Sequence, residues 1–153
     1  MTTNWLSEPE QTAWRNFVTT MPDLDAAFET DLAVHGITMG DYEVLVFLSE
    51  ADDNRLRMCD LASSLRLSPS GLTRRLDGMV KAGWVDRSGC SADRRVMYAH
   101  LTDEGVAKMN AAAPDHVESV RRHFLEPLGA EGVQQLSELF GLIRQHLHQT
   151  QPT

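Results

Sequence analysis

The chain has 153 residues, 42% of them hydrophobic and 24% charged, a composition typical of a globular domain without low-complexity tracts or repeats. Its formal net charge of −8 by itself argues against a nucleic-acid partner. The composition also excludes several classes. No apolar run approaches the roughly 20 residues of a membrane span, residues 1–5 lack a secretion signal, and Cys59 and Cys90 form neither a disulfide framework nor a metal motif, so we expect a cytoplasmic protein.

The first predicted element is a helix within residues 7–36. Ser7 and Glu10 have the spacing of a capping box, and Pro9 follows in the first turn, where its missing N–H does no harm. Apolar residues then recur in steps of three and four, at Trp14, Phe17, Met21, Leu24 and Phe28. We expect Pro22 to kink or split this helix and Gly36 to end it.

The segment 38–102 predicts short helices followed by a hairpin. Thr38 and Asp41 open a second helix, residues 55–58 could form a single strand, and a short helix spans 59–65. Ser68 and Pro69 are a cap and a helix-starting proline, so a further helix is expected over 69–82. Strands over 84–87 and 96–101, joined by the polar stretch 88–95, complete the pattern of a winged helix-turn-helix.

The C-terminal third is predicted to be helical. Thr102 caps a long helix in which Pro114 could introduce a bend. A last helix over 130–148 has an apolar face whose spacing is typical of a helix that packs on another helix: Val133, Leu136, Phe140, Ile143 and Leu147. The fold class predicted from these elements is mainly α with a small β wing.

The distribution of charge is more informative than its sum. Residues 66–96 hold seven basic and three acidic side chains, a net charge of +4, which leaves −12 for the remainder. A basic island on an acidic body is the footprint of a polyanion-binding surface. The alternative is a chance cluster of surface arginines.

The predicted helix 69–82 has the features of a DNA-recognition helix. At 100° per residue, Leu72, Leu76, Met79 and Val80 face the core. The opposite side and its flanks hold small and polar residues followed by arginines: Ser70, Gly71, Thr73, Arg74, Arg75, Asp77, Gly78 and Lys81. Such a surface fits the major groove, since hydroxyls bind phosphates and arginines bind guanine edges. The alternative is an ordinary amphipathic helix with solvated arginines.

The hairpin tip holds the sequence Asp93-Arg94-Arg95. A long, charged tip on a two-stranded ribbon buries nothing, which disfavours a structural role. Arginine inserted into a narrow minor groove reads shape and negative potential. We therefore expect the tip to contact DNA, with Asp93 orienting one of the arginines.

Taken in order, these motifs resemble the MarR family of bacterial regulators. The resemblance lies in Leu61-Ala62-x-x-Leu65, Ser68-x-Ser70-x-Leu72-Thr73-Arg74, Gly83-Trp84-Val85-x-Arg87, Asp93-Arg94-Arg95 and Leu101-Thr102-x-x-Gly105. It covers residues 7–148. The resemblance implies a homodimer that reads palindromic double-stranded DNA, with Arg95 in the minor groove. It also implies a single domain, 1–153, with a DNA-binding lobe at 38–102 and dimerisation helices at 7–36 and 103–148.

The resemblance further implies a small aromatic or amphipathic ligand, bound between the dimer helices and the winged lobe. Arg87 is then the expected carboxylate contact, and Trp14, Met39 and Tyr42 are candidates for the wall of that pocket. Each has a simpler interpretation. Trp14 suits core or dimer packing, and Arg87 could contact a phosphate or pair with an acidic residue.

The resulting hypothesis is a DNA-binding transcription regulator, a repressor that a ligand releases. The expected DNA-binding residues are Ser68, Ser70, Gly71, Thr73, Arg74, Arg75, Arg94 and Arg95. The competing hypothesis is a winged-helix module for dimerisation or protein interaction that does not bind DNA. No metal or other cofactor is expected, because the histidine spacings do not suit a metal ion, and no catalytic motif indicates an enzyme.

Overall fold

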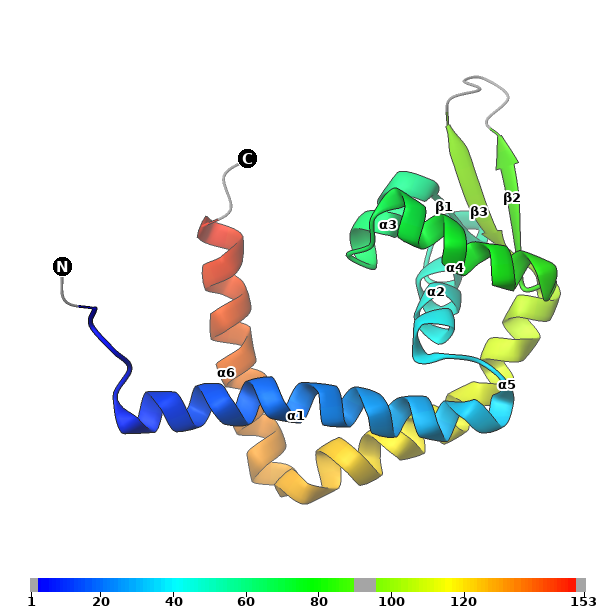
Figure 1. The fold of residues 1–153 in the computed structure, drawn as a ribbon. Helices are drawn as coiled ribbons and strands as arrows, with labels where there is room; N and C mark the ends of the chain where they lie inside the picture. Colours follow the sequence, from blue (N-terminus) through cyan, green and yellow to red (C-terminus); the bar gives the residue numbers. More distant parts are fainter. Residues whose placement is uncertain (1–2, 90–95, 151–153) are drawn as a thin grey trace. The chain divides into compact units, whose positions relative to one another are not determined.

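The computed structural model describes residues 3–89 and 96–150 (Figure 1). They form two compact units, one made of Met1–Phe28 with Val117–Thr153 and the other of Glu29–His116. We call the first the terminal-helix unit and the second the winged lobe. Within the described ranges, no helix combines the length and apolarity that crossing a membrane requires.

The winged lobe has the predicted succession of elements. In chain order these are α2 (Met39–Ser49), β1 (Arg55–Arg57), α3 (Met58–Ser64), α4 (Pro69–Lys81), β2 (Val85–Gly89) and β3 (Met97–Leu101). The end of α1 (Glu8–Leu32), the short 3₁₀ turns η1 (Ala33–His35) and η2 (Asp52–Asn54), and most of α5 (Asp103–Val120) complete it. The predicted fold class, mainly α with a small β wing, is confirmed.

The predicted helix starts are set by local hydrogen bonds. The Thr38 hydroxyl accepts from the Asp41 N–H, and the Asp41 carboxylate accepts from the Thr38 N–H, both at 3.1 Å. Ser7 and Glu10 pair in a similar way at the start of α1, where the Glu10 carboxylate accepts a hydrogen bond from the Ser7 N–H at 2.7 Å. Each cap satisfies a backbone N–H that has no partner inside the helix. Because the capping residue and its partner are only three positions apart, a short stretch of sequence is enough to specify where a helix begins.

The three strands form one antiparallel sheet in the order β1–β3–β2. Leu56 is opposite Ala99, and Arg87 is opposite the same alanine from the other side. Strands β2 and β3 extend together beyond the helices as the wing (Figure 1). The central strand β3 thereby joins the wing to the strand that precedes α3.

The core of the winged lobe lies between its helices and the sheet. Its fully buried side chains come from α2, α3, α4, β2 and β3: Val44, Leu45, Leu48, Leu61, Leu72, Leu76, Met79, Val85 and Ala99. The prediction that Val80 faces this core is wrong, because its side chain is 37% exposed. Leu72, Leu76 and Met79 lie within a narrow arc of α4, and Val80 lies about 70° from the middle of that arc at 100° per residue.

The junction between the wing and α5 is unusually close. A Cβ atom built on Gly105 would lie 2.2 Å from the Trp84 carbonyl oxygen. The Thr102 hydroxyl accepts from the Gly105 N–H at 3.0 Å and donates to the Gly83 carbonyl at 2.7 Å. One threonine thus caps α5 and binds the turn that follows α4.

The terminal-helix unit contains most of α1, the end of α5, a π-helical turn η3 (Arg121–Leu125), a 3₁₀ turn η4 (Glu126–Leu128) and α6 (Gly129–Thr150). Helix α1 runs unbroken through Pro22, so the expected split does not occur. A proline removes one hydrogen bond, to the carbonyl four residues earlier, and the remaining bonds on both sides maintain the helix. Pro114 likewise lies inside a continuous α5.

Candidate nucleic-acid interface

The beginning of α4 is ordered by its own hydroxyl groups. The Ser68 Oγ accepts from the Gly71 N–H at 3.1 Å and lies 3.2 Å from the Ser70 Oγ. Pro69 is the first helical residue, and the Thr73 hydroxyl donates to its carbonyl at 2.9 Å. The predicted cap is confirmed, and this end of the helix presents small polar groups.

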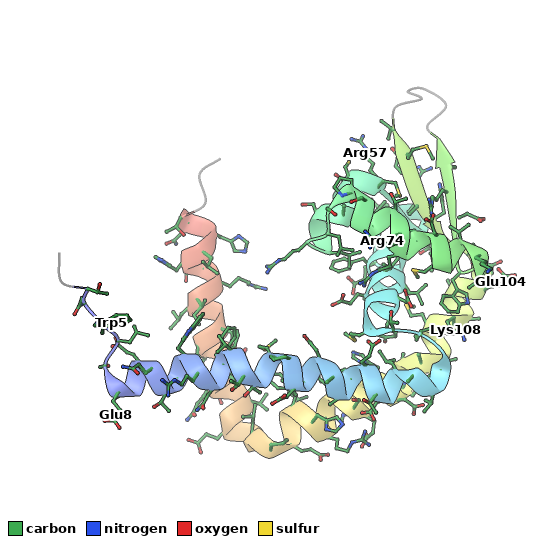
Figure 2. All side chains as sticks on the ribbon, in the orientation of Figure 1. Trp5, Glu8, Arg57, Arg74, Glu104 and Lys108 are labelled. Carbon is green, nitrogen blue, oxygen red and sulfur yellow. The ribbon has the colours of Figure 1, made fainter. Side chains whose placement is uncertain are left out.

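The exposed face of α4 contains most of the residues proposed from the sequence. Ser70, Thr73 and Arg74 are exposed, while Leu72 and Leu76 anchor the opposite face. Arg74 is an exposed residue of α4 in the winged lobe (Figure 2). A helix N-terminus with hydroxyls and a following arginine can bind phosphate oxygens and a base edge together.

Arg75 is placed differently from its neighbour. Its side chain is half-buried, and its guanidinium lies against Gly40 near the start of α2. The sequence placed it on the flank of the outer face, and its contact with α2 depends on a segment 35 residues earlier in the chain. Its expected role in DNA binding stays a prediction.

Arg87 extends from β2 to α4 and forms an ion pair with Asp77. Its Nη2 lies 2.5 Å from Asp77 Oδ1 and 3.5 Å from the Thr73 carbonyl oxygen. The Arg87 side chain is 24% exposed and that of Asp77 63%. Of the interpretations that the sequence left open for Arg87, pairing with an acidic residue is the one this contact supports.

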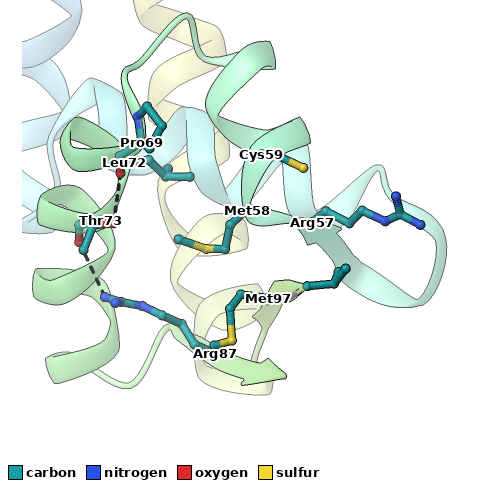
Figure 3. A pocket seen from close by; sticks show the side chains of 9 residues that line it. Arg57, Met58, Cys59, Pro69, Leu72, Thr73, Arg87 and Met97 are labelled. Atoms are coloured by element: carbon teal, nitrogen blue, oxygen red, sulfur yellow. Dashed lines mark hydrogen bonds between the residues drawn. The ribbon is translucent and has the colours of Figure 1, made fainter. Parts of the chain in front are cut away.

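A hollow of about 480 Å³ lies beside this ion pair (Figure 3). Pro69, Leu72 and Thr73 of α4 form one side, and Arg57 and Cys59 form the other. Arg87, Met58, Val96 and Met97 complete its lining. The Arg87 Nε is buried and makes no hydrogen bond to any described residue. The hollow therefore combines apolar walls with the side chain of a cationic residue.

The other candidate ligand residues lie elsewhere. Met39 and Tyr42 belong to a small apolar cluster with Leu32, Ile37 and Ala112, and neither lines the hollow beside Arg87. Burial raises the pKa of Tyr42, whose ring lies 4.7 Å from that of His116. Trp14 belongs to the terminal-helix unit, where it is 58% exposed and lies 6.0 Å from Phe17, ring to ring.

The predicted contacts of the wing tip fall outside the described residues. These are Asp93, Arg94 and Arg95, together with Cys90. Their roles stay predictions.

Two residues on the rim of the hollow were not identified from the sequence as part of this surface. Arg57 is exposed, and a hydrogen bond with Tyr98 is the main cause that raises the pKa of its guanidinium. The alternation Arg55-Leu56-Arg57 was the available signal, since a leucine packed against the core places both neighbours on the open face of the sheet. Cys59 is also exposed, because it lies about 200° around α3 from the buried Leu61.

Comparisons with known proteins agree with this geometry. The sequence profile described as the MarR family matches residues 37–97. The transcriptional regulator PecS of Dickeya dadantii is 30% identical over 125 residues, which cover 81% of this chain and 75% of PecS. The crystal structure of AbsC, a MarR family transcriptional regulator from Streptomyces coelicolor, is 41% identical, with a TM-score of 0.87 over 97% of this chain and 100% of AbsC.

A second structure adds a nucleic acid to the comparison. Sco3205, a MarR family transcriptional regulator from the same organism, was solved in complex with DNA. It is 32% identical and has a TM-score of 0.88, over 99% of this chain and 94% of Sco3205. The match includes the terminal helices as well as the winged lobe. From its ordered motifs, its winged lobe and these relatives, the chain belongs to the MarR family of transcriptional regulators.

Proposed function

We propose that the protein regulates transcription in the cytoplasm as a homodimer that binds palindromic double-stranded DNA through α4 and the wing. The observation that carries the proposal is the exposed N-terminal half of α4. There Ser70, Thr73 and Arg74 point away from a helix anchored by fully buried leucines. The net charge of +4 over residues 66–96 supports a polyanion at this surface despite the acidic remainder.

A fluorescence-anisotropy titration with the DNA that flanks the protein's own gene tests the proposal. We expect nanomolar binding that weakens steeply with salt, and much weaker binding to a random duplex. Arg74→Ala should lower the affinity for the specific duplex about 5- to 150-fold, the range for a base-reading arginine. Arg121→Ala is the matched control, since it removes an exposed arginine of the terminal-helix unit that pairs with Glu118. Equal affinity of the wild type for both duplexes would favour the competing hypothesis of an interaction module.

Exposed apolar side chains support the proposed homodimer. In the terminal-helix unit, helices α1 and α6 expose Trp14, Phe17, Val18, Met21, Leu139, Phe140, Leu142, Ile143 and Leu147, each by 40% or more. Phe17 of α1 and Phe140 of α6 lie 6.0 Å apart, ring to ring, and so many exposed apolar side chains on two helices are typical of a protein interface. Sedimentation velocity of the full chain should give twice the mass of 17.1 kDa. Two lobes on one face of a duplex should then read half-sites about 10 base pairs apart.

The hollow beside Arg87 supports a ligand-responsive repressor. Its volume of about 480 Å³ lies within the range of small-molecule sites. A carboxylate there would compete with Asp77 for the Arg87 guanidinium. Because Arg87 also reaches Thr73, such a ligand would act directly on α4.

Benzoate and benzamide form a matched pair of probes for this site, since they share a ring and differ in charge. Benzoate should raise the melting temperature and weaken DNA binding, while benzamide should do neither. Arg87→Met should abolish the response to benzoate. A benzoate response that persists in Arg87→Met would place the ligand elsewhere, without affecting the proposal on DNA binding.

A further inference from the structure

Gly40, the second residue of α2, lies directly beneath the guanidinium of Arg75. A Cβ atom built on Gly40 would lie 1.4 Å from the Arg75 Nη1, 2.2 Å from its Cζ and 2.7 Å from its Nη2. Non-bonded heavy atoms do not approach so closely, so the guanidinium fills the space that any side chain at position 40 would need. We call this contact the Gly40–Arg75 seat.

The backbone does not explain the glycine at position 40. Gly36, Gly83 and Gly129 have positive φ angles that favour glycine, but Gly40 does not. Alanine stabilises a helical position relative to glycine. The space that Arg75 occupies is therefore the structural reason for glycine here.

The seat depends on shape rather than on charge. Arg75 makes no hydrogen bond or ion pair within the described residues, although its side chain is half-buried. A cation gains nothing from the positive end of a helix dipole. The guanidinium therefore rests on α2 by packing.

The turn that receives Arg75 also contacts α1. The Met39 N–H donates to the Glu29 Oε2 at 2.6 Å, and Glu29 lies in the last turns of α1, which ends at Leu32. Thr38 and Asp41 close the same turn with their capping box. The first turn of α2 thus contacts the end of α1 through Glu29 and contacts α4 through Arg75.

We infer that Arg75 is a positioning residue, which orients α4 by resting on Gly40 in the first turn of α2 instead of contacting DNA. The inference rests on the proposed function, since the orientation of α4 matters because α4 reads DNA. It assigns the two adjacent arginines different tasks. Arg74 faces the nucleic acid, and Arg75 faces the protein and sets the angle at which Arg74 is presented.

The variants Gly40→Ala, Arg75→Met and their combination test the inference in the full-length protein. In Gly40→Ala the new methyl group displaces a flexible side-chain end, so the fold should persist, which circular dichroism verifies. Each single variant should weaken binding to the DNA flanking the gene about 2- to 30-fold, the range for residues that act through a packed element. The double variant should be no weaker than Arg75→Met, because both changes remove the same seat.

The salt dependence separates positioning from direct contact. A positioning role predicts that Arg75→Met keeps the wild-type slope of log affinity against log salt and the wild-type affinity for random duplex. A lost phosphate contact would lower the magnitude of that slope by about 0.9. Should Gly40→Ala fail to fold, the slope of Arg75→Met decides alone.

Two results overturn the inference. One is a lowered slope in Arg75→Met, and the other is wild-type affinity in either single variant. A wild-type protein that does not prefer its flanking DNA over random duplex contradicts the proposed function. If the wild type prefers its flanking DNA and Gly40→Ala binds that DNA with wild-type affinity, only the role of the seat is contradicted.

Discussion

Replacing Gly105 by alanine should strongly destabilise the winged lobe. The new Cβ would lie 2.2 Å from the carbonyl oxygen and 3.1 Å from the carbonyl carbon of Trp84. These are backbone atoms that cannot rotate away, so α5 and the start of β2 must separate by about 1 Å to restore an ordinary contact. That movement strains the bonds of Thr102 to the Trp84 and Gly83 carbonyls, now 3.2 and 2.7 Å long.

The expected loss follows from these contacts. Overpacking of this kind typically costs about 1–3 kcal/mol, and each weakened hydrogen bond about 0.5–1.5 kcal/mol. We therefore expect Gly105→Ala to lower the free energy of unfolding by about 2–6 kcal/mol. Natural domains have only about 5–15 kcal/mol in total.

Urea unfolding monitored by tryptophan fluorescence measures this loss. The protein concentration must be fixed, since the stability of the proposed dimer would depend on it. Gly78→Ala is the matched control, because no atom lies within 4 Å of a Cβ at that exposed position. Alanine there should stabilise α4 by up to about 1 kcal/mol. A loss below about 1 kcal/mol in Gly105→Ala, or equal effects at both glycines, would refute the reasoning.

Further predictions concern packing, assembly and pH. Leu76→Ala should cost about 2.7–5 kcal/mol in urea unfolding, because Leu76 is fully buried. Val80→Ala on the same helix should cost under about 1 kcal/mol, and similar losses would contradict the orientation of α4. A chain that ends at Pro127 should sediment as a monomer or unfold, whereas a stable dimer would exclude α6 from the interface. Burial lowers the pKa of His116 below 6.5, so its contribution to stability is present above pH 6.5 and is lost as the pH falls through the lowered pKa. His116→Gln should flatten the dependence of Tm on pH between 7.5 and 5, and an unchanged dependence would count against this.

The sequence predicts those parts of the fold that depend on neighbouring residues. Ser7, Thr38, Ser68 and Thr102 mark four helix starts, and each forms its capping hydrogen bond with the residue three positions later. The wing follows from two β-forming stretches on either side of a polar one. Helix faces are predicted well at their centre and poorly at their edges, which is why Leu76 is buried as expected and Val80 is not.

The partners of the arginines could not be predicted in this way. Arg87 meets Asp77 across the end of α4 and the start of the wing, and Arg75 meets Gly40 across 35 residues of chain. Long side chains reach several ångströms, so a small change in how two elements pack selects a different partner. Sequence periodicity predicts that such a residue lies at the edge of a helix's exposed face. Whether it faces solvent or a neighbouring helix depends on how the elements pack in the tertiary structure.

The ion pair between Asp77 and Arg87 has a consequence for how a signal could reach DNA. Asp77 is the sole acidic residue of α4, and it lies on the exposed side of the helix. While Arg87 is paired with Asp77, the negative charge of the Asp77 carboxylate is neutralised within the winged lobe. A carboxylate placed within 4 Å of a phosphate repels it by about 1 kcal/mol even in water. An anion that drew Arg87 away would therefore turn a neutral spot on the proposed DNA-binding face of α4 into a repulsive one, so a ligand would weaken DNA binding by changing local charge without moving a helix.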